Sequence, residues 1–139
     1  MATSKVEEAV KYFVNSLVKR LGPKVVKVVL FGGYAKGYAD ERSDLDLLVV
    51  YAGGDGEVLD ATADAALDTL LKFNVPVEPV VMSAYEYEQE TLFTMEVKKT
   101  GRVVYSLNSG EERRVLARDY LTLFGEWFKH AKEDRERGE

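Results

Sequence analysis

The chain has no cysteine and only one histidine, His130, among its 139 residues. The absence of cysteine excludes disulfides, thiolate zinc sites and cysteine nucleophiles together. With a single histidine, neither a multi-histidine metal site nor a histidine-based catalytic dyad is expected. Any catalysis must therefore depend on carboxylates, lysines, tyrosines or a bound cation.

Long hydrophobic runs and an excess of positive charge are also missing. No apolar run approaches the roughly 20 residues of a membrane span, and the N-terminal segment MATSKVEEAVKYF lacks the hydrophobic region of a secretion signal. We therefore expect a cytoplasmic protein with no membrane partner. The net charge of −5 argues against a surface for long nucleic acid, although a locally basic site or a metal could still hold a nucleotide.

Hydrophobic periodicity and turn residues predict a single α/β domain with a small mixed β-sheet and helices packed on it. We expect the main part of the domain over residues 1–107 and a C-terminal helical extension of the same domain over 108–139. The expected elements, in chain order, are a helix over 4–21, strands over 25–31 and 44–51, a helix over 55–73, a strand over 77–82, a helix over 83–99, a strand over 102–106 and a helix over 109–135.

Two expectations concern how these elements pack. Proline inside a strand favours a sheet edge or a bulge, so either is expected for the strand that contains Pro79. On the helix over 55–73, apolar residues at helical spacing predict the inward face, which comprises Leu59, Ala63, Ala66, Leu67 and Leu70.

A glycine turn follows the first predicted strand. The apolar run over 25–31 ends at Gly32 and Gly33, and a short helical turn is expected over 34–37. Backbone N–H groups at such a turn can bind an anion because no side chain blocks the approach, and Lys36 could add a cationic contact to the same phosphates. Taken alone, two glycines are also consistent with a plain turn.

Carboxylates open the next two strands. Asp44 and Asp46 are two residues apart on a strand, so both side chains project from one face. Two carboxylates this close repel each other unless a cation or a proton lies between them, and oxygen ligands of this kind suit Mg²⁺. Glu78, in an otherwise apolar strand, could complete a two-metal site or act as a base. The alternatives are a polar strand edge for the Asp pair and an outward-facing edge acid for Glu78.

The combination of these features resembles a known family. Gly32-Gly33-Tyr34-Ala35-Lys36-Gly37, followed by Ser43-Asp44-Leu45-Asp46-Leu47, is similar to the pattern of the minimal nucleotidyltransferases (MNT) of the DNA polymerase β-like superfamily. The usual pattern of that family is G-S-x-A-R-G followed by S-D-[IL]-D-[LI]. The resemblance runs from about residue 25 to 106 and includes Glu78 at the third acidic position.

The resemblance implies a polymerase β-like fold and a transferase. The reaction would be transfer of a nucleoside monophosphate, AMP from ATP or the equivalent from another NTP, to a hydroxyl acceptor with release of pyrophosphate. The resemblance assigns the nucleotide phosphates to Gly32, Gly33, Lys36 and Ser43, and it assigns two Mg²⁺ ions to the catalytic acids Asp44, Asp46 and Glu78.

Three residues depart from the family pattern. Gly33 stands where serine is usual, Lys36 replaces arginine and so loses the bidentate fork, and Glu78 replaces the commoner aspartate. These departures are the basis of a second hypothesis, in which the protein is a non-catalytic nucleotide-binding or antitoxin module with a degenerate active site.

The last predicted helix carries a broad apolar stripe made of Leu116, Tyr120, Leu123, Phe124, Trp127, Phe128 and Ala131. This stripe can cover its own domain, pair with a second copy in a homodimer, or dock a partner protein; a third hypothesis makes it the working surface of an interaction domain. The family resemblance implies a HEPN-domain helical partner, with the MNT protein as the antitoxin of a toxin–antitoxin pair that modifies a tyrosine of the toxin.

Overall fold

The computed structural model describes residues 4–37, 44–53 and 56–107. Ser43 and the expected C-terminal extension over 108–139 lie outside the described residues. The elements are α1 (Lys5–Leu21), the 3₁₀ turn η1 (Gly22–Lys24), β1 (Val25–Phe31), α2 (Gly32–Lys36), β2 (Leu45–Tyr51), α3 (Gly56–Phe73), β3 (Val77–Ser83), α4 (Ala84–Glu88), α5 (Leu92–Thr100) and β4 (Arg102–Ser106).

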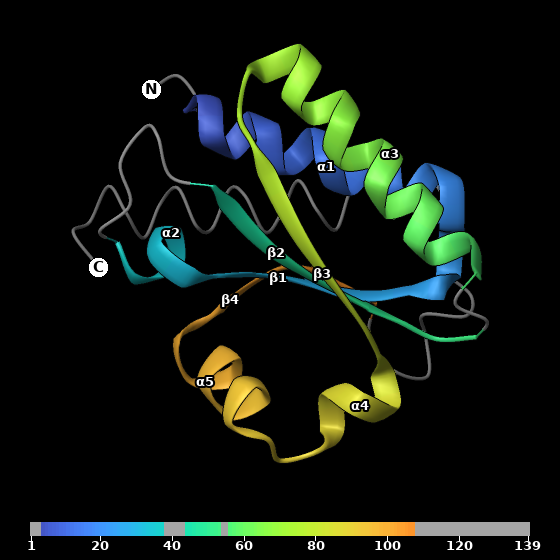
Figure 1. The fold of residues 1–139 in the computed structure, drawn as a ribbon, viewed down its shortest axis with the longest axis vertical. Helices are drawn as coiled ribbons and strands as arrows, with labels where there is room; N and C mark the ends of the chain where they lie inside the picture. The colour runs from blue at the N-terminus through green and yellow to red at the C-terminus, as the bar shows by residue number, and fades with distance from the viewer. Residues whose placement is uncertain (1–3, 38–43, 54–55, 108–139) are drawn as a thin grey trace.

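The four strands form one mixed sheet in the order β3-β2-β1-β4. β1 is antiparallel to both β2 and β4, whereas β2 and β3 are parallel and are connected through α3. Helices α1 and α3 cover one face of the sheet, and the short helices α4 and α5 lie on the other (Figure 1). The predicted α/β class with a small mixed sheet is confirmed.

Helix α1 forms as its sequence predicts. Ser4 is the N-cap, and its hydroxyl accepts a hydrogen bond from the backbone N–H of Glu7 at 3.1 Å. Gly22 ends the helix with a φ of 58°, a left-handed value that costs glycine little. The buried face of the helix consists of Ala9, Val10, Phe13, Val14, Leu17, Val18 and Leu21.

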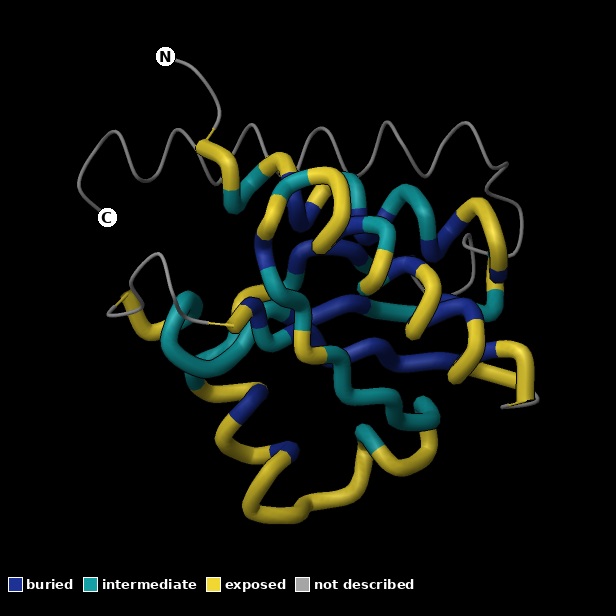
Figure 2. The backbone as a smooth tube through the Cα atoms, turned by 45° about the horizontal axis from the view of Figure 1, so that its top comes forward, coloured by how far each residue is buried: buried dark blue, intermediate teal, exposed yellow. Residues whose placement is uncertain are grey.

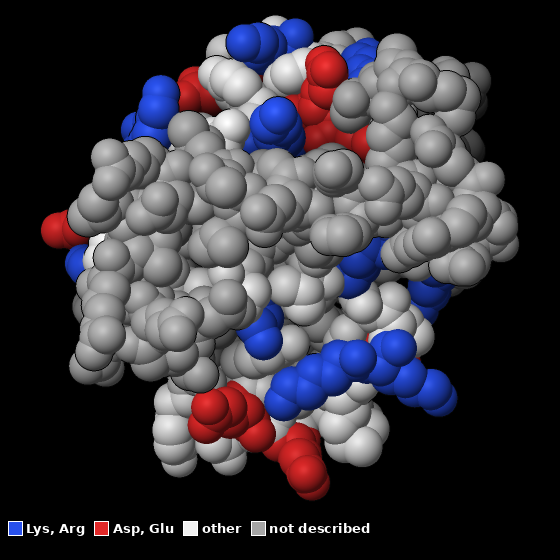
Figure 3. Space-filling model, turned by 180° about the vertical axis from the view of Figure 1, so that it is seen from behind, with Lys and Arg blue, Asp and Glu red and all other residues white. Residues whose placement is uncertain are grey.

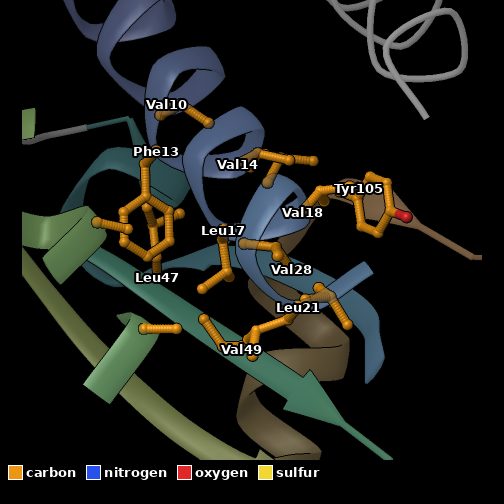
Figure 4. Packing of buried hydrophobic residues seen from close by; sticks show 14 of the residues in the cluster. Val10, Phe13, Val14, Leu17, Val18, Leu21, Val28, Leu47, Val49 and Tyr105 are labelled. Atoms are coloured by element: carbon orange, nitrogen blue, oxygen red, sulfur yellow. The ribbon is translucent and has the colours of Figure 1, made fainter. Parts of the chain in front are cut away.

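Strand β2 lies in the interior and is buried on both faces after Asp46, as the apolar run that follows this residue predicts. Leu45, Leu47 and Val49 join the larger apolar cluster under α1 and α3, where α1 side chains point toward Leu47 and Val49 (Figure 4). Leu48 and Val50 belong to a smaller cluster on the opposite face. Burial is concentrated in the sheet, and the segments that carry α4 and α5 are largely exposed (Figure 2).

The predicted inward face of α3 is wrong. Leu59 and Leu67 are 58% and 53% exposed, and Ala63 and Leu70 are also exposed, whereas Ala66 is only partly buried. The residues that α3 buries are Val58, Ala61, Thr62, Ala65 and Thr69. These side chains are smaller than leucine, and they let α3 lie close against α1 and the sheet. The prediction failed because it placed the largest apolar residues inward.

The single helix predicted over 83–99 is also wrong, since two helices occupy this stretch. Ser83 caps α4, and its hydroxyl and the Glu86 side chain satisfy each other's backbone N–H groups. The chain is extended at Gln89, and Thr91 forms a second capping box with Thr94 that begins α5. The second cap begins a separate helix that runs in a new direction. The spacing of apolar residues along the sequence does not reveal such a change of direction.

Other expectations about the sheet and helices have clear outcomes. β3 is an edge strand, one of the two arrangements that Pro79 predicts. The short helix after the glycine turn begins at Gly32, two residues before the predicted start. Within the described part of the chain, no helix combines the length and the apolar character needed to cross a membrane.

The buried hydroxyls of α3 give a test of its orientation. Thr62 and Thr69 are both buried, but among the described residues the Thr62 hydroxyl has no hydrogen-bond partner, whereas the Thr69 hydroxyl donates to the Ala65 carbonyl oxygen at 2.7 Å. We expect Thr62→Val to raise the free energy of unfolding by roughly 1 kcal/mol because it removes an unsatisfied polar atom. Urea denaturation measures this. The matched control Thr69→Val loses a hydrogen bond, so stabilisation by both variants, or by neither, would contradict the prediction.

Candidate functional site

The ends of three strands meet at the predicted site. In the β1–β2 pairing Phe31 lies opposite Asp46, and in the β2–β3 pairing Asp46 lies opposite Glu78. Gly32 follows Phe31 directly. The sheet therefore brings the glycine turn, the Asp pair and Glu78 to one place, although about 45 residues of sequence separate its ends.

The acidic side chains share one face of the sheet. Successive residues of a strand alternate between faces, so Asp46 projects on the same side as Leu48 and Val50. Those two residues belong to the apolar cluster on the α4–α5 side. Glu78 projects on the same side of β3 as Val80, two residues further along, and Val80 packs against the same apolar cluster. The site therefore opens on the thinly covered side of the sheet, where α5 is its neighbour.

Charge is crowded around Asp46. Burial raises the pKa of its carboxyl, the like charge of Asp44 raises that pKa further, and a hydrogen bond with the Glu78 side chain lowers it. Asp44 and Glu78 are exposed, and Asp46 is half-buried. A divalent cation beside these oxygens would relieve the repulsion, so the donor chemistry fits Mg²⁺. Among the described residues, no three or more acidic, histidine or cysteine side chains are already gathered closely enough to form a metal site.

Gly32 is in contact with the acidic part of the site. Its φ is 71°, and a Cβ atom at this position would collide with the Asp46 carboxylate. The position therefore requires glycine both for its backbone conformation and for the close approach of Asp46. The sequence predicts a glycine turn here, but its contact with Asp46 follows only from the strand register.

Lys36 ends α2, and Gly37 follows it with a φ of 85°. The Lys36 ammonium lies 3.1 Å from a carboxylate oxygen of Glu96 on α5. Sequence analysis did not predict Glu96 as a neighbour of the site, because it lies 60 residues away in an ordinary exposed helix position. Of the site residues predicted from the sequence, Gly32, Gly33, Lys36, Asp44, Asp46 and Glu78 are described, and Ser43 is not.

Known proteins with related sequences share this part of the chain. The family profile described as "Nucleotidyltransferase domain" matches residues 10–104. A candidate protein adenylyltransferase of Methanocaldococcus jannaschii is 36% identical over 101 residues, which are 71% of this chain and 97% of the relative. A second candidate protein adenylyltransferase of the same organism is 30% identical over 95 residues, which are 68% of this chain and 93% of the relative.

Solved structures share the fold. A toxin–antitoxin crystal structure with AMP-PNP contains a chain with a TM-score of 0.52 and 18% identity, over 91% of this chain and 93% of that one. A mutant of the toxin–antitoxin MntA–HpeT gives a TM-score of 0.51 and 16% identity over the same shares. At these identities the likeness shows that the fold is shared, and it shows no more than that.

The matched range contains the whole of β1, α2, β2 and β3, and with them the glycine turn and all three acids. The profile match and the 36% identical relative together establish the family. The chain is a nucleotidyltransferase and belongs to the nucleotidyltransferase domain family.

Proposed function

We propose that this protein is a Mg²⁺-dependent adenylyltransferase that transfers AMP from ATP to a hydroxyl group of a protein and releases pyrophosphate. The observation that carries the proposal is the strand register that places Asp46 opposite both Glu78 and the residue before Gly32. The names of the two archaeal relatives, as candidate protein adenylyltransferases, support AMP as the transferred group and a protein as the acceptor.

The acids are assigned to the metal. Asp44, Asp46 and Glu78 would hold Mg²⁺, with two ions as the expected number. When bound, the metal would neutralise charge on the phosphates and on the reacting oxygens. In the metal-free protein Asp46 lies among like charges in a half-buried place, and this arrangement favours cation binding.

The glycine turn is assigned to the triphosphate. Gly32 and Gly33 carry no side chains of their own, so phosphate oxygens could approach their backbone N–H groups closely. Lys36 would add a cationic contact. Ser43, which directly precedes Asp44 in the sequence, would add a hydroxyl contact. Phosphoryl and nucleotidyl transfer depend mostly on alignment and charge neutralisation, and this division of roles supplies both.

Similarity in fold suggests the acceptor. Relatives in fold come from toxin–antitoxin complexes, one of which contains AMP-PNP. We propose that this chain acts as the antitoxin of such a pair and that its acceptor is a tyrosine hydroxyl of a helical HEPN-domain toxin. Co-expression with the product of a neighbouring gene of that type, followed by mass spectrometry for an added AMP, tests this assignment.

Removing the site's carboxylates is expected to abolish transfer. We expect Asp44→Asn and Asp46→Asn each to lower the rate of pyrophosphate release from ATP and Mg²⁺ by at least about 100-fold, because each removes a charged metal ligand. A coupled pyrophosphate assay measures the rate, and calorimetry measures ATP binding. Asp60→Asn, an exposed aspartate on α3 across the sheet, is the control and keeps the wild-type rate. Equal activity of the wild type and Asp46→Asn would overturn the metal assignment.

Gly32→Ala is expected to lose activity beyond any loss of stability. The added methyl group would collide with the Asp46 carboxylate and move it away from Glu78. We expect turnover per folded molecule to fall at least roughly tenfold, since an ångström of misplacement is costly at such sites. Gly22→Ala is a matched control: Gly22 also has positive φ, but a Cβ there meets no atom within 4 Å. Both variants lose about 1 kcal/mol of stability, and only Gly32→Ala loses turnover. Full turnover by Gly32→Ala contradicts the geometry.

Asp46→Asn is also expected to stabilise the metal-free protein. Because folding raises the pKa of Asp46, the folded protein binds this proton more tightly, and stability falls as pH rises through the folded pKa. At pH 7 the neutral amide avoids this penalty, and we expect the melting temperature in EDTA to rise by roughly 2–5 °C. The gain shrinks as the pH is lowered toward the ordinary carboxyl range. Differential scanning fluorimetry across this pH range measures it. A melting temperature below wild type at every pH would be inconsistent with charge crowding.

A further inference from the structure

An ion pair connects the glycine turn to α5. The Lys36 ammonium lies 3.1 Å from the Glu96 carboxylate, and the two side chains are 33% and 54% exposed. Lys36 is the cationic residue assigned to the triphosphate, whereas Glu96 belongs to no motif of the family pattern. The lysine that would meet phosphate therefore already has an anionic partner within the same chain.

Helix α5 holds Glu96 in a fixed place beside the turn. Thr91 caps the helix, and Thr94 and Val97 are buried beneath it. The Phe93 ring packs edge-on against the Phe31 ring, with centroids 5.5 Å apart, and Phe31 is the residue directly before Gly32. The carboxylate of Glu96 is thus presented to the glycine turn by a helix that packs on the same strand end.

The pair contributes little to the stability of the fold. Half-exposed ion pairs are strongly screened by water, and charged side chains of both signs lie next to each other elsewhere on the described surface (Figure 3). Lys24 and Glu57 form a comparable pair at 3.2 Å, remote from the site at the opposite end of β1. The Lys36–Glu96 pair differs from the Lys24–Glu57 pair in its position beside the glycine turn, and not in its strength.

We propose that Glu96 limits the affinity of the site for its polyphosphate ligand. The inference rests on the proposed function, in which Lys36 binds phosphate. In the nucleotide-free protein Glu96 holds Lys36, and a ligand must displace this carboxylate to reach the ammonium. Any ligand that contacts Lys36 must break this pair, and the cost is the same for a triphosphate and a monophosphate. The carboxylate also repels the ligand directly, and this repulsion grows with ligand charge, so the total penalty is largest for a nucleoside triphosphate.

Glu96→Gln removes the charge and keeps the shape of the side chain. We expect it to bind ATP with Mg²⁺ about three- to tenfold more tightly than wild type, the range expected for an exposed ion pair and a nearby like charge. AMP binding is expected to improve by a smaller factor, because AMP carries less charge for Glu96 to repel, so the preference for ATP over AMP widens. Calorimetry at fixed low salt measures both dissociation constants, and circular dichroism confirms equal folding.

Two controls isolate the ion pair. Glu57→Gln removes the same charge and breaks the remote Lys24–Glu57 pair, and its ATP affinity stays at the wild-type value. In a Lys36→Met background, Glu96→Gln loses most of its effect, because the lysine that it releases is gone. Tighter binding that persists in full in that background would overturn the role of the pair.

The outcomes separate this inference from the proposed function. If wild type binds ATP and Glu96→Gln binds it equally or more weakly, the inference fails and the function stands. If neither binds ATP, the proposed function fails and the inference falls with it. Tighter binding by Glu96→Gln, coupled to Lys36 and absent from Glu57→Gln, supports it.

Discussion

The burial of β2 on both faces is the constraint on which the rest of the structure depends. Its side chains fill the interior between α1 and α3 on one side and supply the cluster under α5 on the other. A strand enclosed in this way has its register fixed, since a slip by one residue would exchange its two faces. Asp46 is the second residue of this strand, so the packing that forms the core also fixes the position of the acid.

This coupling explains why much of the candidate site can be predicted from the sequence. β1 is predicted over the same residues that it occupies, and β2 begins one residue after its predicted start, because continuous apolar runs bounded by glycine and aspartate leave few other registers. Pro79 leaves an edge or a bulge for β3, and the strand lies at the edge. The spacing of Asp44 and Asp46 needs only the period of a strand. Each of these inferences depends on neighbours in sequence, where backbone geometry is most restrictive.

What the sequence could not predict depends on distant packing. On α3 the leucines are the obvious inward candidates, yet the available space next to α1 and the sheet fits Ala61, Ala65 and threonines instead. The break at Gln89 results from a second capping box within one apolar stretch. Glu96 reaches the glycine turn because α5 folds back across β1, and no local pattern encodes that contact. The spacing of apolar residues records neither the size of side chains nor the direction of helices. These two properties decided the buried face of α3, the break at Gln89 and the contact of Glu96.

The contact between Gly32 and Asp46 also constrains how this chain can evolve. Any side chain at position 32 needs room that is now filled by the carboxylate at position 46, so the glycine and the acid form a linked pair. A lineage that acquires a larger residue at the turn must shorten or redirect the acid. A lineage that loses the acid still needs glycine at position 32, because the backbone there has a φ of 71°. Substitution at the turn is therefore expected to be accompanied by change at position 46, whereas substitution of the acid need not be accompanied by change at the turn.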